Sequence, residues 1–214
     1  MDRCLTHIGR EGFLDEVRGL PAKHHQAFIL AASHYGRALR EIGVDEEMVF
    51  VRLVSAVESV AGDEQIDADP LSGRNLESLF RVEDLTLEAI EELKKTFEVR
   101  KTKARFLAFL DRNSADFFPE QPTGPPRTQV THANLRAVAS AVYNARSNYL
   151  HKGDPMYLSR WVASFPEWHM DSSVGMQLGD RYFREQDKLP RADFFHRLVR
   201  HCVLRRLREL ATAG

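Results

Sequence analysis

Several residue types and motifs are scarce in this 214-residue chain, and each shortage excludes a class of protein. The two cysteines, Cys4 and Cys202, are too few for the disulfide framework of a small secreted protein. No apolar stretch approaches the roughly 20 residues that span a bilayer. The first residues also lack the apolar run of a secretory signal. We therefore expect a cytoplasmic protein with no membrane partner.

Residues that favour β-strands are scarce as well. The chain has 5 Ile and 8 Thr against 23 Leu and 21 Ala, which predicts an all-α fold. An excess of positive charge is also missing, because 30 Lys and Arg face 31 Asp and Glu. Any nucleic-acid binding must therefore be local. Neither a Gly-rich phosphate loop nor a Gly-x-Ser-x-Gly elbow is present, so the sequence does not support nucleotide hydrolases or serine esterases of those designs.

Apolar residues recur with the helical period of 3.6 along most of the chain. The pattern predicts long helices at residues 21–43, 45–62, 102–118, 132–152 and 191–210. Shorter helices are expected at 76–80 and 87–97, and helical pieces packed by aromatic residues at 155–185. Four of the nine prolines fall in residues 119–130, which predicts a surface loop. We expect one helical domain over residues 1–214.

The predicted helix that ends before Gly153 has a narrow apolar face. On a helical wheel this face contains Leu135, Val138, Val142, Ala145 and Tyr149. Arg146 lies at the border of the face, and His151 lies about 140° further round the helix. Two such side chains do not meet on one regular helix. Either the last turn is distorted, or two chains complete one another.

Two segments of the sequence resemble a known family. Residues 143–153, YNARSNYLHKG, are similar to the motif of HEPN domains, an Arg and a His at a short fixed spacing, and the nearest subgroup is the ApeA-like HEPN proteins. Residues 50–60, FVRLVSAVESV, resemble the family's apolar helix that carries a glutamate, here Glu58. Residues 101–111, KTKARFLAFLD, occupy the place of a further helix of that subgroup. The resemblance covers about residues 45–153, which leaves additional N-terminal helices and a C-terminal helical extension at 155–212.

The resemblance implies a helical bundle that forms a homodimer and cleaves RNA without a metal or another cofactor. The products would be 2′,3′-cyclic phosphate and 5′-hydroxyl ends. Arg146 would hold the scissile phosphate, and His151 would transfer a proton. Phage defence or a stress response is the role that the resemblance implies, as a toxin with an antitoxin or sensor protein as partner. One position departs from the family pattern, because Ser147 follows the arginine where many active members have Asn, Asp or His.

Other residues are expected to support this pair. Glu58 lies on the apolar stripe of its helix, so we expect it to pair with Arg146 or a neighbouring donor. The alternative is a glutamate at the edge of the stripe that reaches solvent. Ser147 lies one turn before His151 and could orient it, or be a tolerated small residue. Three further residues could contact a nucleotide: Tyr143, Asn144 and Asn148. Tyr143 could equally pack at a subunit interface.

Two basic concentrations, the first within residues 94–105, could supply local charge for RNA. The candidates are Lys101, Lys103, Arg105 and Lys152, and a second concentration lies within residues 191–208. The alternative is that these runs are solvated helix faces.

Two broader alternatives remain. The chain could be a non-catalytic HEPN module for dimerisation or binding, in which Arg146 has a structural role. Cys4 with His7, and His196, His201 and Cys202, have partial zinc-ligand spacing, but a structural site usually needs four ligands in two paired clusters. We therefore expect no metal site.

Overall fold

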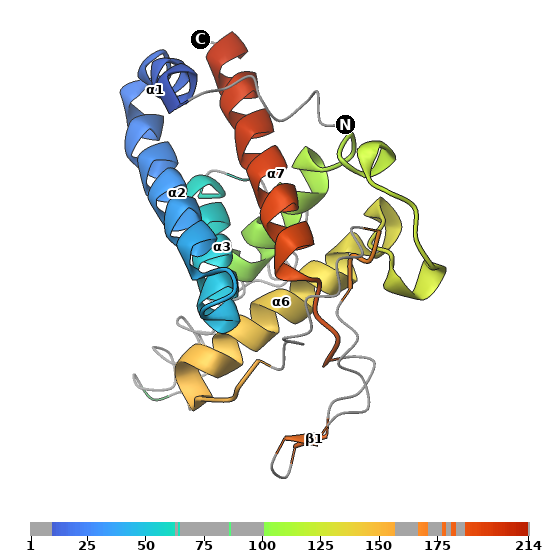
Figure 1. Ribbon diagram of the computed structural model, residues 1–214. Coiled ribbons are helices and arrows are strands. Elements are labelled where there is room, and N and C mark those ends of the chain that lie inside the picture. Colours follow the sequence, from blue (N-terminus) through green and yellow to red (C-terminus); the bar gives the residue numbers. More distant parts are fainter. Residues whose placement is uncertain are drawn as a thin grey trace.

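The computed structural model in Figure 1 describes residues 10–62, 64, 86, 101–156, 167–170, 177–178, 181–182 and 187–213. These residues are mostly helical, which confirms the all-α prediction. The named helices are α1 (Arg10–Arg18), α2 (Ala22–Glu41), α3 (Glu46–Val60), α6 (His132–Lys152) and α7 (Ala192–Ala213). Residues 101–113 are also helical. The short helices predicted at 76–80 and 87–97 lie outside the described residues.

The ends of the long helices follow from local capping chemistry. Before α3, the Asp45 carboxylate accepts the Met48 backbone N–H at 3.1 Å. At the start of α6, the Asn134 side chain accepts the Thr131 backbone N–H at 2.8 Å. Gly153 ends α6 in the left-handed conformation, with φ 71°, which glycine adopts without a steric penalty. The predicted bounds of α2, α3, α6 and α7 are therefore confirmed to within a few residues.

The helix predicted at 102–118 ends earlier than expected, at residue 113. The buried Asn113 side chain donates to the Phe109 carbonyl at 2.8 Å, and the Phe117 N–H bonds to the Ser114 carbonyl in a turn. Phe117 still reaches the core and packs edge-on against Phe194, with ring centroids 5.7 Å apart. Phe117 therefore reaches the core from a turn, whereas the sequence pattern predicted that it does so from a helix.

Residues 119–130 were predicted to form a surface loop, and residues 155–185 to form helical pieces. Residues 119–130 form a mostly exposed loop, interrupted by the 3-10 turns Phe118–Glu120 and Pro126–Thr128. Of residues 155–185 only 155–156, 167–170, 177–178 and 181–182 are described, and these are not helical; the rest of the predicted helical pieces lie outside the described residues. Instead, β1 (Gln177–Leu178) pairs antiparallel with β2 (Arg181–Tyr182), and Met170 forms an isolated bridge with Pro190.

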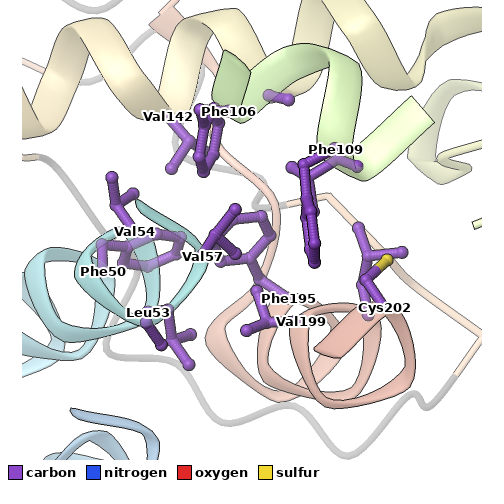
Figure 2. Close-up of a cluster of buried hydrophobic side chains, with 14 of the residues drawn as sticks. Phe50, Leu53, Val54, Val57, Phe106, Phe109, Val142, Phe195, Val199 and Cys202 are labelled. Carbon is purple, nitrogen blue, oxygen red and sulfur yellow. The ribbon is translucent and has the colours of Figure 1, made fainter. Parts of the chain in front are cut away.

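Helix α3 is the centre of the core. It packs against α2, α6 and α7, and in Figure 1 α6 crosses the group formed by α2, α3 and α7. Figure 2 shows Phe50 of α3 near Phe195 of α7, and these rings stack with centroids 5.6 Å apart. Phe106 and Phe109 add two fully buried rings from the helical residues 101–113. Polar side chains of α3 and α6 meet where these two helices cross.

None of the described helices combines the length and the apolar character that a membrane-spanning segment requires.

Candidate functional site

A carboxylate and a guanidinium meet where α3 crosses α6. The Arg146 Nη2 donates to Glu58 Oε2 at 3.1 Å. The side chains of Arg146 and Glu58 are only 18% and 19% exposed. The predicted pairing of these two residues is therefore present, and the alternative of a solvent-reaching Glu58 does not hold.

The buried face of α6 is rotated from the predicted face. The fully buried residues are Leu135, Ala139, Val142 and Tyr143, whereas Val138, Ala145 and Tyr149 are only partly buried. Arg146 therefore lies within the buried face, and the prediction that it lies at the border is wrong. The reason is that α6 packs against both α3 and residues 101–113, where the Phe106 ring lies 5.3 Å from the Tyr143 ring.

Tyr143 is a core residue of one chain. It is 5% exposed, and its hydroxyl donates to Glu58 Oε1 at 3.1 Å. Burial, followed by the charge of Glu58 and the hydrogen bond to it, raises the pKa of Tyr143 to about 12. The structure therefore corrects the expectation that Tyr143 contacts a nucleotide or a partner subunit. Its spacing of three residues before Arg146 was the signal that could have placed both side chains on Glu58.

His151 is exposed at the opposite side of the same helix. The last turn of α6 stays helical to Lys152, so of the two alternatives the distorted last turn is absent. Beyond Gly153, the Met156 N–H donates to Glu47 Oε1 at 2.6 Å and ties the end of α6 to the start of α3. Within one chain, Arg146 faces the core and His151 faces solvent, so the structure does not bring them together.

Two other candidate residues do meet. Lys103 Nζ donates to the exposed Asn144 Oδ1 at 2.8 Å, a contact that the sequence did not predict. Partial burial lowers the pKa of Lys103. Ser147 and Asn148 are half-buried, and no side-chain hydrogen bond joins Ser147 to His151 in the described part of the chain. The remaining basic candidates are at least partly exposed: Lys101, Arg105 and Lys152.

Within residues 191–208, Arg191, Arg205 and Arg206 meet carboxylates, whereas Arg197 bonds to the Asp193 backbone carbonyl at 3.0 Å and Arg208 is exposed. Arg205 bonds to Asp116 and to Glu209, the latter at 3.2 Å, and Arg206 lies 3.8 Å from Glu209. Arg191 donates to Asp193 at 2.9 Å. Part of the charge of this second basic concentration is therefore balanced within the chain.

The described residues contain no group of three or more His, Cys, Asp or Glu side chains arranged to hold a metal ion. Cys202 is fully buried, and burial raises the pKa of its thiol above the ordinary value. Cys4 and His7 lie outside the described residues.

Comparison with protein-family models, with curated proteins and with solved structures gives no match for this chain.

Proposed function

We propose that the protein is a metal-independent endoribonuclease of the HEPN type, which leaves 2′,3′-cyclic phosphate and 5′-hydroxyl ends. The observation that supports the proposal is the fixed Arg146. One guanidinium nitrogen bonds to Glu58 and Nε is buried, so a phosphate would bind the part of the fork that belongs to the 18% of the side chain still exposed. In this proposal the protein is cytoplasmic and acts on RNA in defence or stress, restrained by an antitoxin or sensor protein.

The chemistry assigns one role to each side chain. A guanidinium stabilises negative charge that develops on the phosphate oxygens as the 2′-hydroxyl attacks. An imidazole takes the proton of the 2′-hydroxyl or returns one to the leaving 5′-oxygen, because it titrates near neutral pH. His151 is exposed and therefore accessible for this role.

The site requires two chains. On one helix, Arg146 and His151 are separated by about 140° and about 7.5 Å along the axis. Because the end of α6 is tied to Glu47, one chain does not close this separation without breaking its last turn. The proposal therefore combines Arg146 of one protomer with His151 of the partner subunit across a two-fold axis.

A mixing experiment tests this arrangement. Arg146→Ala and His151→Ala should each abolish cleavage of mixed RNA in EDTA. After subunit exchange, an equal mixture of the two variants should recover about one quarter of wild-type activity, because half of the dimers are mixed and each holds one complete site. His132→Ala is the matched control, since His132 is exposed at the other end of α6. Full activity of both single variants would refute the nuclease proposal, and inactivity of the mixture would refute the shared site.

The non-catalytic alternative is also based on the contact between Glu58 and Arg146. Glu58 already neutralises the charge of Arg146, and the contact lies where two core helices cross. If Arg146 is only structural, Arg146→Ala should lower the stability of the protein or separate a dimer, while His151→Ala should change nothing measurable. Unfolding curves and the molar mass in solution distinguish this module from the enzyme.

A further inference from the structure

A cavity of about 180 Å³ that is partly open to solvent lies between α1, α2 and α7, away from the crossing of α3 and α6. Its lining is mostly apolar and includes Phe13, Ala31, Ala32, Val203 and Leu204. An apolar cavity of about 150 Å³ is large enough to hold a benzene molecule. The space therefore suits the apolar part of a small ligand.

One cation lines the same cavity. Arg200 lies on the wall that α7 contributes. Its side chain makes no hydrogen bond or ion pair with another residue in the described part of the chain, unlike Arg205 and Arg206 on the same helix. A positive charge beside an apolar cavity, without a carboxylate partner, is complementary to an anion.

A second polar group is held next to this cation. Tyr35 lines the cavity from α2, and its hydroxyl lies 3.2 Å from Nδ1 of His196. Arg200 is close enough to favour the ionised form of Tyr35, although burial raises the pKa of that hydroxyl overall. The polar edge thus contains one fixed hydroxyl and one cation. A single arginine balances a single negative charge, which favours a carboxylate over a doubly charged phosphate.

We propose that this cavity binds a small amphipathic carboxylate. The hydrocarbon part lies among Phe13, Ala32 and Leu204, and the carboxylate accepts hydrogen bonds from the Arg200 guanidinium. A ligand of about the size of hexanoate matches the volume. The site is built from helices outside residues 45–153, so it is independent of the proposed ribonuclease activity, and either proposal can fail alone.

Titration calorimetry of the full chain with hexanoate tests the site. Hexanoate should bind one site saturably, and hexanol, which keeps the chain but lacks the charge, should bind about tenfold more weakly. Arg200→Gln should weaken hexanoate binding by about tenfold and leave hexanol binding unchanged. Ala32→Phe should abolish the binding of both probes, because the new ring fills the cavity.

Arg208→Gln is the matched control, because Arg208 is exposed on α7, does not line the cavity and carries the same charge. This variant should bind hexanoate as the wild type does. A thermal unfolding curve of each variant establishes that it is folded. Absence of saturable hexanoate binding by the wild type would overturn the proposal. Equal affinity in wild type and folded Arg200→Gln would also overturn it.

Discussion

The contact between Glu58 and Arg146 should stabilise the fold more than an exposed ion pair of the same length. The perturbation is a double-mutant cycle with Glu58→Ala, Arg146→Ala and the double variant. Exposed pairs in such cycles contribute about 0.2–1 kcal/mol, whereas hydrogen bonds to charged groups contribute about 1.5–3 kcal/mol. Both side chains are about four-fifths buried, so screening by water is reduced. We expect a coupling free energy of about 2 kcal/mol.

The single variants should be more harmful than the coupling alone suggests. Glu58→Ala removes the acceptor for both Arg146 and Tyr143 and leaves a guanidinium partly buried without a counter-charge. We expect a loss of about 3 kcal/mol in the free energy of unfolding. Urea denaturation at neutral pH, followed by circular dichroism, measures all four proteins.

The chain offers an internal control for this prediction. Arg18 and Asp15 also lie 3.1 Å apart, but their side chains are 78% and 69% exposed. The same cycle on this pair should give no more than about 0.5 kcal/mol. Equal coupling at both pairs would refute the argument that burial strengthens the contact between Glu58 and Arg146.

Four further predictions concern pH and glycine. The pKa of Tyr143 is raised to about 12 from 10.0, so its contribution to stability is complete below pH 10 and is lost as the pH rises toward 12. Urea unfolding across this range should show a decline in the free energy of unfolding, and Tyr143→Phe should reduce that decline. Burial lowers the pKa of His169 below 6.5. The free energy of unfolding should therefore fall as the pH drops below 6.5, by at most about 1.4 kcal/mol per pH unit. His169→Gln should make this dependence on pH less steep. Gly36→Ala, in an open position of α2, should raise the free energy of unfolding by about 0.5–1 kcal/mol. Gly124→Ala should lower the free energy of unfolding by about 1–3 kcal/mol, because the new methyl group would overlap the Glu167 carbonyl. Melting curves of both glycine variants show whether each substitution stabilises or destabilises the protein.

Local signals in the sequence were sufficient to place most helices. Capping residues such as Asp45 and the glycine at 153 act on neighbouring backbone groups, so their effect is visible without tertiary structure. The end of the helix at residue 113 was missed because a helical period alone does not separate Phe117 in a turn from Phe117 in a helix, and the hydrogen bond from the buried Asn113 amide to the Phe109 carbonyl is not visible in that pattern.

The candidate site was only partly predictable. A carboxylate on an apolar stripe needs a partner, and this requirement predicted that Glu58 pairs with Arg146 or a neighbouring donor without selecting between them. The rotation of α6 was not predictable, because it depends on where α3 and Phe106 press against the helix. The bond from Lys103 to Asn144 joins residues 41 positions apart, and no local pattern indicates such a pair.

Because Cys202 is buried, chemical labelling of its thiol can report how often the core opens. Its thiol has no exposure to solvent, and Figure 2 draws it with Phe109 in the buried cluster to which α7 and residues 101–113 both contribute. An alkylating reagent can therefore modify this sulfur only after those helices separate. In a Cys4→Ser background, the labelling rate would measure how often the interior opens, with no added probe to disturb the packing.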